Sequence, residues 1–427
     1  MKFLNLGEKI RKLRKEKGLT LEELAGDIAT KSYISLIENN KSVPRLDVLK
    51  HIANMLEVEL EYLVKDENTE AKEYCDLKIK ELKTNLEYKE YKIVETLITE
   101  LEEIIEKYDL KLQRGKLLSV KGFYLIKKEI LEEALLNLHK GNRIYLEEGY
   151  DKEAIIENYH YIGYIYTKQK QFKSALDKYK VCEQMIDSED ILDTELKRKI
   201  YFNISICYYE LGLYEKSLDY ISYVTNIMED NNNLELGRNI MHKGNTYIKL
   251  NQYKKAEKCF KNSLKIAKKA KDSKYEAYIE NNLGRVYLTN GDEEKGLYHL
   301  NNAYTLKKLY GYSNINTLLE YVMYYINKED FNKAVKYLKE AEKNNKKDEN
   351  LYKIYNHYCE VYVNLKENDK AKEYIKKSIN ILENMERPAE LSKAFEKYAN
   401  ILELENKLSE SIEYLKLSIK LKDKEKI

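Results

Sequence analysis

The 427-residue chain has little proline and glycine, with two and fifteen residues respectively, and it has no tryptophan. Proline and glycine both disfavour helix interiors, so their scarcity in a chain this long excludes a fold rich in turns. Lysine, glutamate, leucine, isoleucine and tyrosine are abundant instead. We therefore predict an all-α protein. Because the chain exceeds the usual size of one domain, we expect at least two units.

The sequence also lacks an excess of charge of one sign. Charged residues make up 35% of the chain, yet they balance to a net charge of +2. This balance excludes a protein that binds nucleic acid through its overall charge. Any contact with DNA must therefore come from a local patch.

Paired cysteines and long apolar runs are missing as well. The five cysteines are far apart and form no CxxC motif, which indicates reduced thiols packed between helices rather than disulfides or a zinc site. No apolar run approaches the roughly 20 residues that span a membrane, and the first residues lack the apolar core of a signal peptide. We expect a cytoplasmic protein with no membrane partner.

Catalytic and cofactor motifs are equally scarce. The chain contains no GxxxxGK[ST] phosphate loop, no GxGxxG and no HExxH, and its six histidines are scattered without paired ligand spacing. No arrangement of serine or cysteine with histidine suggests a nucleophile. We therefore expect no enzyme, no cofactor and no metal.

Residues 1–65 carry the helix start and stop signals of a small domain. Gly18 ends a first helix, and Thr20 with Glu23 three residues later forms a capping box that begins a second. Thr30 stands where it would cap a third helix. Two further apolar stretches predict a fourth and a fifth helix. Two short helices joined by a tight turn and covered by others form a helix-turn-helix.

This domain resembles the Cro/repressor (XRE) DNA-binding domain in the stretches "LGEKIRKLRKEKGLTLEELA" and "SYISLIENNKSVPRLDVLKHIANMLEVELEYL". The resemblance implies that the third helix, residues 31–39, enters the major groove of double-stranded operator DNA. Its outward side chains would contact base edges, with one apolar contact such as to a thymine methyl group. The implied base contacts are Lys31, Ser32, Tyr33, Ser35 and Leu36, and the implied phosphate contacts are Thr20, Asn39, Lys41 and Arg45.

Other positions follow from the same resemblance. Arg14 and Glu38 match a pair that forms an internal salt bridge in this family. Asn40 stands where glycine is usual, and asparagine tolerates the left-handed backbone that such a turn needs. We expect part of the basic run at residues 9–17 to assist on DNA, although it could be only a solvated face. The alternative for the whole domain is a degenerate fold kept for dimerisation.

A repeating pattern fills the rest of the chain. A small residue is followed by a bulky one three later, a small one twelve later and a bulky one sixteen later, as in Gly163, Tyr166, Ala175 and Tyr179. Further copies begin at Gly122, Ser205, Gly244, Gly284, Val322, Cys359 and Ala399, and a weaker copy centres on Leu82 and Val94. Small residues at these spacings suit two antiparallel helices that cross closely, stacked into a solenoid.

The repeats resemble tetratricopeptide repeats, whose usual period is about 34 residues. We therefore expect a helix-turn-helix domain at residues 1–65, a polar linker at residues 66–73, and eight to nine helical hairpins at residues 74–427. These hairpins would form a right-handed superhelix that binds a peptide and carries the dimer contact.

The tetratricopeptide resemblance also implies which residues line the concave groove. Asparagine amides there would both donate to and accept from an extended peptide backbone, and arginines would take a carboxylate. The expected groove residues are Tyr161, Tyr164, Asn203, Arg238, His242, Asn245, Asn281, Asn282, Arg285, Asn316 and Asn356. The alternative is that asparagine merely solvates the surface of a lysine- and isoleucine-rich chain.

The combination of the two parts resembles the RRNPP family of bacterial regulators. Membership would imply a homodimeric transcription factor controlled by a short signalling peptide in quorum sensing. Two alternatives stay open: a phage- or element-type repressor whose repeats bind a protein antirepressor, and a Rap-like module that acts by protein interaction alone.

Overall fold

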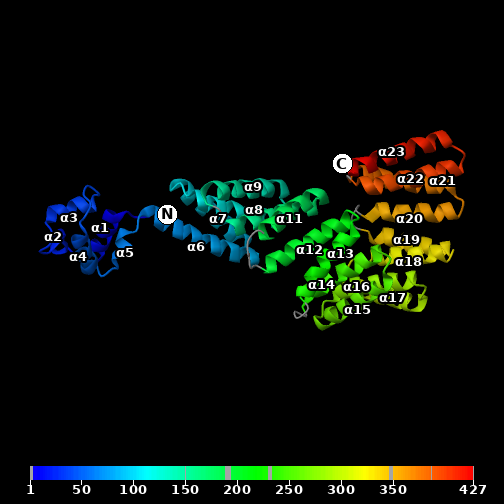
Figure 1. Ribbon diagram of the computed structural model, residues 1–427, viewed down its shortest axis with the longest axis horizontal. Coiled ribbons are helices and arrows are strands. Elements are labelled where there is room, and N and C mark those ends of the chain that lie inside the picture. The colour runs from blue at the N-terminus through cyan, green and yellow to red at the C-terminus, as the bar shows by residue number, and fades with distance from the viewer. Residues whose placement is uncertain are drawn as a thin grey trace. The chain divides into compact units, whose positions relative to one another are not determined.

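The computed structural model describes residues 3–149, 151–187, 194–228, 233–345, 350–385 and 387–426. Within these residues the regular structure is helical throughout, with no strand, which confirms the predicted fold class (Figure 1). The chain divides into two compact units, residues 1–211 and residues 212–427. This division falls inside the repeat region rather than at residue 65.

The N-terminal unit contains the helices α1 to α12. The first five are short: α1 (Leu6–Glu16), α2 (Leu21–Ala25), α3 (Lys31–Glu38), α4 (Leu46–Leu56) and α5 (Leu60–Val64). The longer helices that follow are α6 (Glu67–Glu87), α7 (Tyr91–Lys107), α8 (Lys111–Lys127), α9 (Leu131–Glu148), α10 (Lys152–Lys168), α11 (Phe172–Asp187) and α12 (Thr194–Glu210).

The C-terminal unit continues with helices of similar length. They are α13 (Tyr214–Ile227), α14 (Leu234–Lys249), α15 (Tyr253–Lys269), α16 (Ser273–Thr289), α17 (Glu293–Leu309), α18 (Ile315–Asn327), α19 (Phe331–Asn344), α20 (Leu351–Asn364), α21 (Asn368–Glu383), α22 (Pro388–Leu404) and α23 (Leu408–Lys426). Among the described residues, none of the helices combines the length and apolar character that a membrane span requires.

The local signals of the first five helices act as predicted. The Thr20 hydroxyl accepts from the Glu23 N–H at 3.1 Å, and the Glu23 carboxylate accepts from the Thr20 N–H at 2.7 Å. Thr30 caps α3 by accepting from the Tyr33 N–H. Asn40 adopts the left-handed backbone, with φ of 56°. These caps fix where α2 and α3 begin, and so fix the turn between them.

The segment 66–73, expected to be a linker, is instead mostly helix. Asp66 caps α6 by accepting from the Thr69 N–H at 2.8 Å, and α6 begins at Glu67. The polar composition that suggested a linker reflects the exposed face of this helix, since Ala71 in the same segment is fully buried. The first turns of α6 therefore belong to a regular element.

Lys9 joins the short helices to α6. Its side chain is 1% exposed, and its ammonium donates to the backbone oxygens of Tyr62 at 3.0 Å and Lys65 at 2.6 Å. The same ammonium lies 2.6 Å from the Glu70 carboxylate on α6. Lys9 was part of the basic run expected to assist on DNA, but these buried contacts remove it from that surface.

Phe3 makes a second attachment between the N-terminal segment and the repeat helices. Its ring packs edge-on against Tyr74 on α6 and against Tyr108 at the end of α7, with centroid distances of 5.6 Å and 5.5 Å. The Phe3 N–H also donates to the Tyr108 hydroxyl at 3.1 Å. Together with Lys9, Phe3 holds the short helices against α6 and α7.

The repeat helices pair into hairpins through the predicted small and bulky positions. A Cβ added at Gly163 on α10 would lie 2.6 Å from the Tyr179 ring on α11, sixteen residues later. The corresponding contacts are Gly122 to Leu138, Gly244 to Phe260 and Gly284 to Leu300, at 2.7, 2.8 and 2.7 Å. Only a residue without a side chain admits the bulky partner at this distance, which confirms the spacing read from the sequence.

Candidate functional site

The exposed face of α3 gathers most of the residues expected to contact DNA bases. At 3.6 residues per turn, Lys31, Ser32, Ser35, Leu36 and Asn39 fall on one side of this helix. The Leu36 side chain is 44% exposed, so it is free to make an apolar contact on this side. The opposite side, with Ile34 and Ile37, is buried in the domain core. The sequence therefore gives α3 one anchoring side and one free side.

Tyr33 lies at the border between these two sides. It is half-buried, it packs against the domain core, and its hydroxyl donates to the Val43 backbone oxygen at 3.2 Å. This bond ties α3 to the loop that follows it. The structure thus gives Tyr33 a structural contact, and its expected contact with a base stays a prediction.

The residues expected to contact phosphates lie around α3 and are exposed. The Thr20 hydroxyl serves as the cap of α2, while Lys41 and Arg45 follow the end of α3. The Arg45 guanidinium lies 3.7 Å from the Asp47 carboxylate. The Asn39 amide donates to the Ser35 backbone oxygen on its own helix at 2.7 Å. Cationic and polar groups therefore surround the exposed side of α3.

Arg14 and Glu38 form the internal pair that was predicted. The guanidinium Nε lies 2.6 Å from one carboxylate oxygen, and Nη2 donates to the other at 3.0 Å. Nη1 donates to the Leu19 backbone oxygen at 2.8 Å. Because Glu38 is buried, it is not part of the exposed face of α3. The pair connects α1 to the last residue of α3 and orients that helix.

In the C-terminal unit, predicted groove residues meet across the first helices of consecutive hairpins. The Asn282 amide on α16 donates to the Asn245 side-chain oxygen on α14 at 3.2 Å. Arg285 on α16 lies 3.9 Å from the Glu320 carboxylate on α18. Contacts continue from α20 to α22, where the Glu360 carboxylate lies 3.9 Å from the Lys397 ammonium. We call this set of side chains on α14, α16, α18, α20 and α22, together with Asn281 on α16 and Asn356 on α20, the polar row.

Several polar atoms of this row are buried without a hydrogen-bond partner among the described residues. They include the side-chain oxygens of Asn281 and Asn356 and the Nε of Arg285. Asn281 is 6% exposed. A buried polar atom left unpaired costs about 1–3 kcal/mol, so a group of them needs an explanation. These atoms comprise both acceptors and a donor, the combination that a peptide backbone complements.

Two charged groups, Glu320 within the row and Lys307 beside it, have shifted pKa values. Burial raises the pKa of the Glu320 carboxyl, while Arg285, His357 and Lys307 act in the opposite direction. Burial lowers the pKa of Lys307 to about 8, and its ammonium donates to the Thr317 hydroxyl at 2.8 Å. Lys307 lies on α17, a second helix of a hairpin. No sequence signal distinguishes it from the many solvated lysines.

The other predicted groove residues of this unit lie in different surroundings. Arg238 is exposed on α14, 3.7 Å from the Asp272 carboxylate that caps α16. Asn316 is exposed in the first turn of α18. His242 is half-buried on α14. The contacts described for the row do not include these three residues, and their role in binding stays a prediction.

The N-terminal unit holds an aromatic pocket at the remaining predicted positions. Tyr161 and Tyr164 on α10 line a cavity of about 640 Å³ together with Phe123 on α8, whose ring lies 4.9 Å from that of Tyr161. The Asn203 amide lies 3.1 Å from the imidazole of His160, another lining residue. Burial lowers the pKa of His160 to about 4, so the imidazole is neutral at physiological pH.

The sequence matches two kinds of protein family. A helix-turn-helix domain family matches residues 7–69, and tetratricopeptide repeat families match residues 238–309, 315–348 and 352–384. A comparison with curated protein sequences gives no match.

Three solved structures resemble the chain over most of its length. The apo form of RapI has 18% identity and a TM-score of 0.59, covering 83% of this chain and 98% of that one. The apo quorum sensor NprR from B. thuringiensis has 18% identity and a TM-score of 0.59, covering 82% and 99%. The Rap conjugation gene regulator of plasmid pLS20, in complex with the Phr* peptide, has 16% identity and a TM-score of 0.51, covering 83% and 96%.

At these identities the likeness establishes the fold, and the family matches establish the two kinds of module. The helix-turn-helix match spans nearly all of α1 and the whole of α2 to α5. The repeat matches cover most of α14, α16, α18 and α20, which carry polar-row residues, and end before α22. The chain therefore combines a helix-turn-helix domain with tetratricopeptide repeats, and its fold is similar to the folds of RapI and NprR.

Proposed function

We propose that this protein is a cytoplasmic, homodimeric transcription regulator that binds operator DNA through α3 and responds to a short signalling peptide. One observation carries the peptide half of the proposal. Buried polar atoms without a partner among the described residues lie at Asn281, Arg285 and Asn356, which are positions expected to line a peptide groove.

The DNA half rests on the division of α3 into two sides. Ile34 and Ile37 anchor the helix in a core shared with α1, α2 and α4. Lys31, Ser32 and Ser35 on the free side supply hydrogen-bond donors and acceptors, which suits readout in a major groove. A domain kept only for dimerisation would gain nothing from an exposed lysine and two hydroxyls on this helix.

The peptide half also follows from chemistry. An extended peptide offers one N–H donor and one C=O acceptor per residue. Asparagine amides in the polar row match both groups without selecting a side chain. Arg285, 3.9 Å from Glu320, offers a guanidinium that a peptide carboxylate would share. The structural likeness to a Rap protein in complex with the Phr* peptide supports the same class of ligand.

Regulation requires that the peptide bind two states of the dimer with different affinity. In this proposal, peptide binding along the repeats changes how the two helix-turn-helix domains of the dimer are placed. Dimers of this type read half-sites about 34 Å apart, one turn of DNA, or a multiple of that distance. A change in placement therefore changes operator affinity.

A protein-interaction module without DNA binding is the second candidate function, favoured by the fold similarity to RapI. Gel-shift measurements separate the two candidates. The full-length protein should shift a fragment of its own upstream region in preference to an unrelated fragment of equal length. A shift of neither fragment would favour the second candidate.

The decisive experiment for the ligand is purification from the native host followed by mass spectrometry. We expect a short peptide to accompany the wild-type protein and to be lost from the double variant Asn281→Ala, Asn356→Ala. Calorimetry with the identified peptide and with its scrambled sequence measures specificity. Equal retention of the peptide by both proteins would contradict a site in the polar row.

A further inference from the structure

The outer side of α15 carries an unusual line of lysines. The helix contains seven lysines and a single glutamate. Five of the lysines, Lys254, Lys258, Lys261, Lys265 and Lys268, follow one another at spacings of four, three, four and three residues. At 3.6 residues per turn these positions share one side of the helix, and all five side chains are exposed. We call these residues the lysine stripe.

Three members of the stripe have no acidic partner in the part of the chain that the structure describes. Lys261 lies 2.7 Å from the Glu257 carboxylate, and Lys268 lies near two glutamates of α16. Lys254, Lys258 and Lys265 have no such neighbour among the described residues. Like charges three and four residues apart destabilise a helix, so the fold itself gives no reason for this arrangement.

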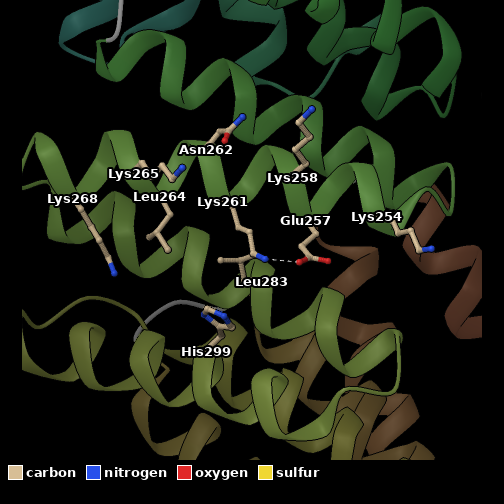
Figure 2. A pocket seen from close by; sticks show the side chains of 10 residues that line it. All are labelled: Lys254, Glu257, Lys258, Lys261, Asn262, Leu264, Lys265, Lys268, Leu283 and His299. Atoms are coloured by element: carbon tan, nitrogen blue, oxygen red, sulfur yellow. Dashed lines mark ion pairs between the residues drawn. The ribbon is translucent and has the colours of Figure 1, made fainter.

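The stripe borders a groove with an apolar floor. A cavity of about 610 Å³ lies between α15, α16 and α17, and the stripe lines it. The half-buried Leu264 contributes apolar surface, the lining residue Leu283 is fully buried, and His299 faces the cavity from α17 (Figure 2). A second cavity of about 740 Å³ is also lined by Lys258 and Lys265, so these two lysines stand between two hollows.

The chemistry of this surface selects its partner. A row of unpaired ammonium groups suits an anionic partner, and the half-buried Leu264 suits apolar side chains among the anionic groups. Nucleic acid supplies phosphates, but its backbone carries no side chain to cover Leu264. An amphipathic acidic helix supplies both, because carboxylates at alternating spacings of four and three residues would lie opposite the lysines along about 20 Å of helix.

We propose that the groove beside α15 is a docking surface for an acidic amphipathic helix of a partner protein. The apolar side chains of the partner cover Leu264, and its carboxylates pair with Lys254, Lys258 and Lys265. This surface lies on a second helix of a hairpin, whereas the polar row lies on first helices. The proposal does not rest on the proposed peptide or DNA binding.

The test uses the full-length protein and a labelled synthetic peptide. The peptide forms a helix with glutamates at alternating spacings of four and three residues and leucines between them, and its analogue carries glutamine in place of glutamate. Fluorescence anisotropy at fixed salt measures both. We expect the glutamate peptide to bind the wild type, and the triple variant K254E/K258E/K265E to bind it at least tenfold more weakly.

A matched control comes from α19, another second helix. Lys336, Lys339 and Lys343 are exposed and also have no acidic partner among the described residues. The variant K336E/K339E/K343E therefore makes the same change in net charge at another place, and it should bind the peptide within twofold of the wild type. If the glutamate variant fails to fold, the neutral variant K254Q/K258Q/K265Q takes its place in the same binding measurement.

Four results would overturn the proposal. They are no binding of the glutamate peptide to the wild type, equal binding of the glutamine analogue, equal weakening by the α19 variant, and unchanged binding to both variants of the stripe. Tighter binding of a random double-stranded oligonucleotide than of the peptide, weakened by the stripe variants alone, would assign the surface to nucleic acid instead. Operator binding by α3 should be unchanged in the stripe variants, which separates this test from that of the proposed function.

Discussion

Arg14 and Glu38 face each other across the helix-turn-helix domain with two hydrogen bonds between guanidinium and carboxylate, at 2.6 Å and 3.0 Å. The side chains are 13% and 5% exposed. One residue lies on α1 and the other ends α3, so this pair sets the position of the helix expected to enter DNA.

Breaking this pair should destabilise the domain. Arg14→Ala leaves the buried Glu38 carboxylate without its partner, and such a change costs about 3 kcal/mol. The measurement is urea unfolding followed by circular dichroism. Lys12→Ala is the matched control, because the Lys12 and Glu16 side chains are exposed and 3.9 Å apart, and it should change stability by less than about 0.5 kcal/mol. Equal effects of both substitutions would contradict a structural role for Arg14.

Removing the polar groups from the free side of α3 should abolish specific DNA binding without unfolding the domain. We expect Lys31→Ala with Ser35→Ala to weaken operator binding tenfold or more, since one good base contact is worth about 1–3 kcal/mol. Gel shifts at fixed salt measure the affinity. Lys50→Ala on α4 removes an exposed lysine elsewhere in the domain and should bind the operator like the wild type. An unchanged affinity of the double variant would refute the assignment of α3.

Truncating an amide of the polar row should weaken peptide binding. Asn281→Ala and Asn245→Ala are each expected to cost about 1 kcal/mol or more in binding free energy, the usual worth of a hydrogen bond. Calorimetry with the peptide identified from the host gives these values. Asn332→Ala replaces an exposed asparagine on α19 and should bind normally. If both variants bind the peptide with wild-type affinity, these two residues are not part of the binding site.

Lys307 should make the stability of the C-terminal unit depend on alkaline pH. Its pKa is about 8 in the folded protein, against 10.5 as the ordinary value. Between these pH values the unfolded chain binds this proton and the folded chain does not, so raising the pH favours folding. The full effect is about 3 kcal/mol, at 1.36 kcal/mol for each pH unit.

The variant Lys307→Met isolates this contribution from other groups that titrate in the same range. It carries no proton at this position, so its stability at neutral pH should exceed that of the wild type. The advantage should disappear as the pH rises from about 8 to about 10.5. Urea unfolding of both proteins across this range gives the difference, and a difference independent of pH would show that Lys307 is not neutralised by burial.

Filling the space at Gly163 should weaken the hairpin of α10 and α11. The alanine methyl group would lie 2.6 Å from the fully buried Tyr179 ring, and overpacking of this kind costs about 1–3 kcal/mol. Gly149→Ala is the control, since nothing lies within 4 Å of its added Cβ. Thermal unfolding should show a lower Tm only for Gly163→Ala. A raised Tm would mean that helix propensity outweighs the contact.

The sequence predicts these features where their causes are local. The capping of α2 by Thr20 depends on residues three apart, and the pairing of Gly163 with Tyr179 depends on a spacing within one hairpin. Both were predicted and both are confirmed. The left-handed Asn40 was expected from its place in a turn, and it too is confirmed.

Features created by distant segments escape such reasoning. Lys9 lies among solvated basic residues in the sequence, yet carbonyl oxygens at the end of α5 and a carboxylate of α6 surround it. The residues around Lys307 likewise bury it, and no pattern in the sequence indicates that burial. The burial of Tyr33 depends on the loop that returns over α3. The resemblance to tetratricopeptide repeats predicted residues of the polar row, but only the structure identifies which of their polar atoms are buried without a partner among the described residues.

The burial of Lys9 has a practical consequence for protein engineering. A chimaera that exchanges the helix-turn-helix segment at residue 65 would separate the Lys9 ammonium from the Glu70 carboxylate and Phe3 from Tyr74. The graft would then keep the Lys9 ammonium on the backbone oxygens of Tyr62 and Lys65 but without its carboxylate, and it would leave the Phe3 ring uncovered. A transplantable module therefore extends through α6 and α7, since Tyr108 is the last residue that holds Phe3.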